Sequence, residues 1–216
     1  LGTDVDSPIR IESSIHSRAA GASDVRDAAE TDNKYPTMQP NQRQGAGDLI
    51  KELGRDEEWK YTNLKPVLKH DYKIMLKSES AVSFGDIKQY LLSDLDTYKL
   101  VFINGKYSSW LSESTHQSYD ICTFAAALNK YPDILAEYLG QAAPAGETFV
   151  DLNTAFADDG AYIRVKANQT VDKPIEILYI TTDENGTSFS QNRNLIIVEQ
   201  NAEVQILERH QNLGDT

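Results

Sequence analysis

Ala161-Tyr-Ile-Arg-Val165 and Pro174-Ile-Glu-Ile-Leu-Tyr-Ile-Thr181 are two strand-like runs joined by a short, mostly polar stretch. In each run, apolar residues alternate with polar or aromatic ones, which gives a strand one inward and one outward face. Further runs rich in strand-forming residues lie at Arg193 to Val198 and at Glu203 to Leu207, and the same alternation returns in Val204 to His210. Because the connections are too short for crossover helices, we expect residues 148–216 to form the first turns of a β-solenoid. From periodicity alone, an ordinary β-sandwich is the alternative.

The residues before this stretch predict two further parts. Residues 1–44 contain few large apolar residues and no sustained period, so we expect a mobile or atypical N-terminal arm. Residues 45–147 predict an α/β region of short helices and one hairpin. Residues 148–216 would then be the β-helix core, with a short helix at Thr148 to Phe156 capping its open end.

The α/β region contains clear start and stop signals. Asp48 to Leu53 and Val82 to Leu92 place apolar residues at helical spacing. Thr123 to Leu139 predicts helices interrupted at Tyr131-Pro132, because proline disrupts a continuous helix. Asn104-Gly105 lies between two apolar runs and predicts a type I′ hairpin, since both residues accept positive φ angles.

The charge balance excludes several functional classes. With 21 basic and 33 acidic residues and a pI near 4.7, the chain repels phosphate backbones, so nucleic-acid binding is not expected. No apolar run is long enough to cross a bilayer and no signal pattern opens the sequence, which predicts a cytoplasmic protein without membrane contact. A single cysteine, Cys122, excludes a disulfide framework or a multi-cysteine metal site within one chain.

Few residues suggest chemistry. Cys122 precedes a predicted helix, whose N-terminus would favour the thiolate, but its apolar neighbours favour a small buried residue instead. His210, at a strand end beside Glu208, could ligate iron together with a partner's groups, although a solvated histidine is the preferred interpretation. Asp158-Asp159-Gly160 lacks the further ligands of a calcium loop and is better explained as a turn. We therefore assign no catalytic, cofactor-binding or metal-binding residue to this chain alone.

Five ordered motifs carry a family resemblance. They are Glu57-Glu-Trp-Lys-Tyr-Thr-Asn-Leu64, Leu100-Val-Phe-Ile-Asn-Gly-Lys-Tyr-Ser108, Leu152-Asn-Thr-Ala-Phe-Ala-Asp-Asp-Gly-Ala-Tyr-Ile-Arg-Val165, Lys173-Pro-Ile-Glu-Ile177 and Arg193-Asn-Leu-Ile-Ile-Val-Glu-Gln-Asn-Ala-Glu-Val-Gln-Ile-Leu-Glu-Arg-His210. Together they resemble the SufB/SufD family of iron-sulfur cluster assembly proteins, and the ordered set is far more specific than one motif. The first motif and the hairpin look more like the SufD branch than the SufB branch.

The resemblance implies a fold, a function and a set of partners. The implied fold is a right-handed parallel β-helix, preceded by an α/β region and followed by a helical region. SufD and SufB pair through their β-helices, and both bind the ATPase SufC through C-terminal helices. The implied function is that of a non-catalytic scaffold subunit, not an enzyme, in a complex that builds iron-sulfur clusters and passes them to carriers. A flavin has been associated with this assembly, but no motif here would bind it.

The chain differs from the family in its length, and one alternative function has to be weighed. Family members are roughly twice as long, so we expect a fragment that lacks the later rungs and the SufC-docking region and has SufB as its partner. The alternative is a cytoplasmic β-solenoid enzyme acting on a carbohydrate, which needs paired carboxylates on one face. Glu176, Glu199, Glu203 and Glu208 are instead scattered among arginines, so the scaffold interpretation is preferred.

Overall fold

A computed structural model describes most of the second half of the chain and parts of the first. The described residues are 9–14, 63, 73–74, 81–92, 94–113, 119–142, 148–157, 159–182 and 188–214. The helix predicted at Asp48 to Leu53 lies outside the described residues.

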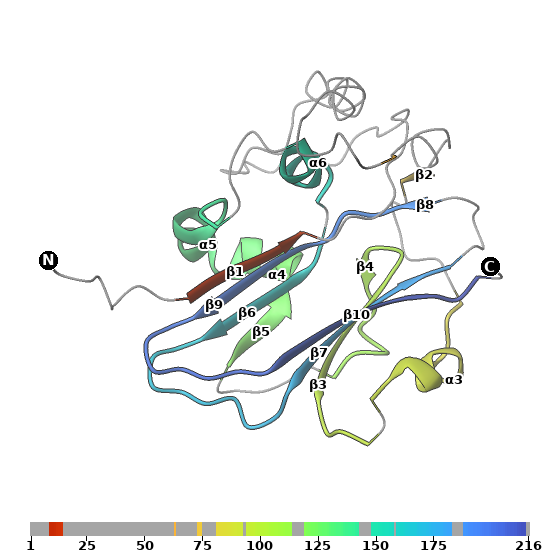
Figure 1. Cartoon of the computed structure of the whole chain (residues 1–216), viewed down its shortest axis with the longest axis horizontal. Coiled ribbons are helices and arrows are strands. Elements are labelled where there is room, and N and C mark those ends of the chain that lie inside the picture. The colour runs from red at the N-terminus through yellow and green to blue at the C-terminus, as the bar shows by residue number, and fades with distance from the viewer. Residues whose placement is uncertain are drawn as a thin grey trace, which may run out of the picture.

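Two four-stranded sheets contain most of the described strands (Figure 1). The first sheet has the order β1-β9-β6-β5, with these strands at Ile9–Ser14, Arg193–Val198, Ala161–Val165 and Asp120–Thr123. The second sheet has the order β10-β7-β3-β4, with these strands at Ile206–Asn212, Ile175–Thr181, Tyr98–Ile103 and Lys106–Tyr107. A short parallel pair joins β2, Lys73–Ile74, to β8, Ser188–Phe189.

The chain passes between the two sheets repeatedly. Each time it returns to a sheet, the new strand pairs in parallel with the strand that it formed there on the previous pass. It leaves β6, crosses to β7, returns to β9 beside β6, and crosses again to β10 beside β7. In the first sheet Tyr162 lies opposite Leu195, and in the second Ile177 lies opposite Glu208. Successive crossings therefore lie next to each other in both sheets.

The turns that leave the first sheet are stacked as well. Asn168 and Asn201 have positive φ angles of 61° and 55°, a conformation that asparagine adopts more readily than most residues. The Asn201 amide donates to Oδ1 of Asn168 at 3.2 Å, and Thr170 forms a parallel bridge with Glu203. These contacts keep the two crossings in register.

An apolar interior holds the two sheets together. It is built from alternate residues of the facing strands, such as Leu100, Ile163 and Ile177, which are fully buried. Burying one such side chain contributes about 1.5–3 kcal/mol relative to leaving it in water. The alternation seen in the sequence therefore produces the inter-sheet core.

Short helices cover the outer faces of both sheets (Figure 1). On the second sheet, Ile87 packs from α3, Phe84–Ile87, and Leu91 packs from the position directly after the 3-10 turn η2, Lys88–Tyr90. On the first sheet, Phe124 and Leu135 pack from α4, Phe124–Lys130, and α5, Pro132–Tyr138. The main layers are thus helix, sheet, sheet and helix.

The hairpin and the interrupted helix predicted from the sequence are confirmed. Strands β3 and β4 join at Asn104 and Gly105, whose φ angles are 49° and 83°. Helix α5 begins at Pro132, where the missing N–H needs no partner. Helix α6 has the predicted bounds, Thr148–Phe156, whereas the helix predicted over Val82 to Leu92 is shorter than expected.

The predicted combination of a β core with α/β elements is confirmed, but the described residues form no closed solenoid. Strands β1, β4 and β5 pair antiparallel at sheet edges, so both sheets are mixed. The right-handed parallel β-helix and the three domain boundaries therefore stay predictions.

Some strands were predicted wrongly or missed. The strand expected at Glu203 to Leu207 begins at Ile206 and extends to Asn212, because pairing with β7 outweighs the weak strand propensity of its polar residues. Strand β1 lies within the predicted N-terminal arm, where no strand was expected, and pairs with all six residues of β9. Strand β5 was also missed, since four residues show too little alternation.

Gly160 precedes β6 at a point where the backbone of Arg193 passes very close. A Cβ at residue 160 would lie 2.6 Å from the carbonyl carbon of Arg193. We predict that Gly160→Ala lowers the free energy of unfolding by about 1–3 kcal/mol, because overpacking forces the strands apart. Urea unfolding followed by circular dichroism measures this loss.

Gly85 provides the matched control in α3. A Cβ there would meet only Ser83 Oγ, at 3.5 Å, so Gly85→Ala should be neutral or stabilising by up to about 1 kcal/mol. An equal loss of stability in both variants would contradict the close packing of Gly160 on Arg193.

Candidate functional site

Asp159 is a nearly buried carboxylate just before β6. Its oxygens accept hydrogen bonds from the backbone N–H groups of Gly160 at 2.9 Å, Ala125 at 3.3 Å and Tyr107 at 3.4 Å. Burial raises the pKa of the Asp159 carboxyl, while these hydrogen bonds and the nearby Lys106 oppose that rise. The carboxylate thereby joins the hairpin, α4 and β6, which suits a structural turn better than a calcium site.

Arg193, at the start of β9, attaches helix α6 to the first sheet. Its guanidinium donates to Oδ1 of Asn153 at 3.2 Å and to Oγ1 of Thr154 at 2.9 Å. The Asn153 amide donates in turn to Oε1 of Gln191 at 2.8 Å and to the carbonyl oxygen of Asn192 at 3.0 Å. Because Arg193 and Asn153 are buried, these bonds satisfy their polar groups and fix α6 beside β9. The capping role of α6 stays a prediction.

A second polar cluster lies between the sheets at β10. Glu208 and His210 are alternate residues of this strand and lie opposite the core residues Ile177 and Tyr179. The Nε2 atom of His210 is 3.3 Å from Oε1 of Glu208. From β9, the Asn194 amide donates to Oε2 of Glu208 at 3.2 Å, and its Oδ1 accepts from the Tyr179 hydroxyl at 2.6 Å. We call Glu208, His210, Asn194 and Tyr179 the rim cluster.

The rim cluster runs from the buried interior to the surface. Asn194 is fully buried and Tyr179 nearly so, whereas the side chains of Glu208 and His210 are 22% and 45% exposed. The Tyr179 ring stacks on His210, with centroids 4.8 Å apart, and on Phe102 at 5.0 Å. These three rings share one register position on neighbouring strands. His210 is therefore partly solvated, as expected, but its ring is also held against the interior.

Cys122 is half-buried in β5 beside α4. Burial raises the pKa of its thiol to about 11, although the nearby Lys130 opposes that rise. The fully buried Tyr162 lies directly opposite on β6. At neutral pH the side chain is therefore a thiol, which agrees better with a small packed residue than with an activated thiolate.

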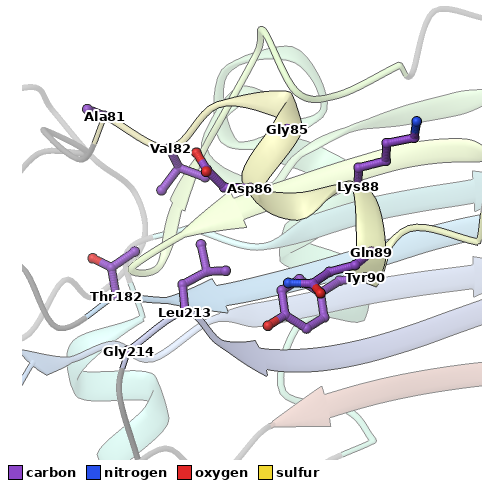
Figure 2. Close-up of a pocket in the computed structure, with 10 residues that line it drawn as sticks. All are labelled: Ala81, Val82, Gly85, Asp86, Lys88, Gln89, Tyr90, Thr182, Leu213 and Gly214. Carbon is purple, nitrogen blue, oxygen red and sulfur yellow. The ribbon is translucent and has the colours of Figure 1, made fainter.

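A hollow of about 980 Å³ lies between the α3–η2 segment and the ends of the second sheet (Figure 2). Asp86 and Tyr90 line one side of it, and Thr182 and Leu213 line the other. The Asp86 carboxylate already caps α3, since it accepts from the hydroxyl and N–H of Ser83 at 2.6 and 2.8 Å, which lower its pKa. Among the described residues that line this hollow, Asp86 is the only carboxylate, and it is already engaged as a helix cap.

The other histidines, His16, His70 and His116, lie outside the described residues, as does Asp158. Within the described ranges, no three His, Cys, Asp or Glu side chains gather into a metal-binding group. None of the helices in the described part is long and apolar enough to cross a membrane.

Sequence reasoning named Glu208 and His210 but missed the residues that support them. Tyr179 and Asn194 come from β7 and β9, so no local motif connects the four residues. The alternation of Glu208 and His210 was the available signal, because residues two apart in a strand share a face. The alternation from Val204 to His210 was noted, but the strand itself was expected at Glu203 to Leu207, so the two residues were not placed in a paired strand.

The fold and the site define a class: an α/β protein with two facing sheets, in which successive crossings pair in parallel and enclose a partly polar interior. A family model described as the SufBD protein N-terminal region matches residues 30–177. The chain therefore belongs to the SufBD family, which confirms the resemblance found in the sequence.

Relatives support this assignment. An iron-sulfur cluster assembly SufBD family protein of Synechocystis is 34% identical over 181 residues, which cover 79% of this chain and 38% of the relative. The iron-sulfur cluster assembly protein SufD of Escherichia coli is 25% identical over 163 residues, covering 74% of this chain and 36% of the relative. The chain thus spans well under half the length of these relatives.

We predict that Cys122 of the native protein reacts slowly with a thiol reagent at pH 8. Because its pKa is raised from 9.0 to about 11, the thiolate fraction at this pH is roughly one hundredth of that in the unfolded chain. The reaction with Ellman's reagent, in buffer and in urea, measures both rates on the chain's single cysteine. A native rate as fast as the unfolded rate would reveal an activated or freely exposed thiol.

Proposed function

We propose that this chain is a non-catalytic scaffold subunit in iron-sulfur cluster assembly, built on the first turns of a right-handed parallel β-helix. Parallel pairing of β6 with β9 and of β7 with β10, in a member of the SufBD family, carries this proposal. Stacked strands of this kind present a long side and an open end, which suit the binding of another protein.

The stacked turns support the β-helix part of the proposal. Asn168 and Asn201 occupy equivalent places in successive turns and are hydrogen-bonded to each other. Repeated polar contacts at equivalent turns are what a coil-on-coil arrangement requires, because each turn is stabilised chiefly by its neighbours. An ordinary sandwich of antiparallel hairpins would not place these turns together.

SufB is the proposed partner, bound through the β-helix, and the ATPase SufC completes the proposed complex. The name of the Escherichia coli relative, SufD, and the names of both relatives as iron-sulfur cluster assembly proteins support this choice. The cluster is the cargo of the whole complex, and the proposed scaffold role requires no cofactor bound by this chain alone. We place the protein in the cytoplasm.

Ion pairing of Glu176 and Glu199, two of the four glutamates considered from the sequence, argues against the carbohydrate enzyme. Glu176 is buried and accepts a charged hydrogen bond from Arg209 at 3.4 Å. Glu199 pairs with Arg164 at 2.6 Å. A glycosidase needs two carboxyl groups that face one bound sugar, whereas these two are each engaged by an arginine.

Co-purification tests the proposed function. The tagged chain is expressed with SufB, with SufC and with both from the same source, and the purified material is analysed for iron and sulfide. We expect SufB to be retained, with iron and sulfide present when the complex assembles. Retention of neither protein, by a chain that is folded in circular dichroism, would contradict the scaffold role while leaving the family assignment intact.

The glycine variants supply matched controls for this experiment. Gly85→Ala should retain SufB, because the substitution leaves the sheets unchanged. Gly160→Ala should retain less SufB, because it disturbs the pairing of β6 with β9 on which the proposed binding surface depends. Equal retention by the two variants would show that SufB binds elsewhere on the chain.

A further inference from the structure

We propose that Glu208 and His210 form a two-ligand site for a first-row divalent metal ion, with water in the remaining coordination positions. The site lies at β10, where the interior between the two sheets reaches the surface. This proposal does not rest on the scaffold function, and it concerns residues to which the family assignment gives no role.

Strand geometry brings the two ligands together. Glu208 and His210 are two residues apart in β10, so both side chains leave the strand on the same face. Arg209, between them, leaves on the opposite face and pairs with the buried Glu176. The guanidinium is therefore directed away from the pair and does not take the place of a metal ion.

The separation of the two ligand atoms fits coordination better than a strong ion pair. Nε2 of His210 and Oε1 of Glu208 are 3.3 Å apart. A charge-assisted N–H···O hydrogen bond is shorter, about 2.7–2.9 Å. Two ligand atoms bound at about 2.1 Å lie about 3.0 Å apart at a right angle and about 3.4 Å apart at the tetrahedral angle. The observed distance falls between these two coordination geometries.

The surrounding residues hold both ligands in place. Asn194 is fully buried and donates to Oε2 of Glu208, the oxygen that does not face the imidazole. Its own position is fixed by Ala161 N–H at 2.7 Å and the Tyr179 hydroxyl at 2.6 Å. The Tyr179 ring stacks nearly parallel on His210, at an interplanar angle of 14°. Supporting contacts of this kind orient metal ligands and raise metal affinity.

Exposure and charge favour a cation at this place. The two side chains are 22% and 45% exposed, so water has access to the open positions. The net charge of −12 attracts cations to the molecule. Imidazole nitrogen with a carboxylate oxygen suits zinc, cobalt and similar ions, and calcium and magnesium are disfavoured because they prefer oxygen ligands alone.

Cobalt(II) titration of the full chain, followed by visible absorption, tests the site. We expect His210→Ala and Glu208→Gln each to weaken Co²⁺ binding at least about tenfold, since even supporting residues change metal affinity by about 10–100-fold. Gln211→Ala, on the same strand but the opposite face, should bind Co²⁺ like the unaltered chain. Urea unfolding of each variant checks that the strand remains folded.

A second readout locates the ion. Bound Co²⁺ should shift or broaden the nuclear magnetic resonance signals of Tyr179 and Asn194, and Zn²⁺ should displace it. Unchanged affinity in both ligand variants, binding only at millimolar Co²⁺, or paramagnetic effects remote from Tyr179 would each overturn the proposal.

Discussion

Parallel pairing between successive crossings is the constraint on which the rest of the structure depends. Because β9 lies beside β6 and β10 beside β7, every second side chain of each strand must face the other sheet. Ile163 and Ile196 meet this requirement in the first sheet, and Ile177 meets it in the second. A shift of one residue in either ladder would turn these side chains away from the core.

Several polar and backbone contacts fix the point at which the chain enters β6. Asp159 binds three backbone N–H groups from different elements, and Gly160 lets β6 pass directly against the backbone of Arg193. Arg193 then ties α6 to the start of β9 through Asn153. These polar contacts set where β6 begins, and the parallel register of β9 follows from that starting point.

Local patterns predicted the elements that local chemistry determines. Apolar alternation identified Ala161–Val165, and a run of strand-forming residues identified Arg193–Val198, both with correct bounds. Asn104-Gly105 identified the hairpin, and Pro132 identified the start of α5. Elements that depend on distant partners were missed, as β1 was, or predicted with wrong bounds, as β10 was. Strand β10 continues through polar residues because β7 provides its ladder, and no local signal shows that partner.

The candidate site was accessible from the sequence only in part, for the same reason. Glu208 and His210 were noticed as neighbours, but their interior position follows from the register with Ile177 and Tyr179. Asn194 joins them only because β9 and β10 lie in facing sheets. The family resemblance predicted the class of protein correctly, since it relied on ordered motifs spread along the chain.

Cross-strand nuclear Overhauser contacts in the isotope-labelled chain test the central claim most directly. The account predicts parallel patterns that connect Ile163 with Ile196 in one sheet and Ile177 with Glu208 in the other. It also predicts contacts between the turns at Asn168 and Asn201. Antiparallel patterns between these strands, or a register shifted by one residue, would contradict the stacked arrangement and the rim cluster built on it.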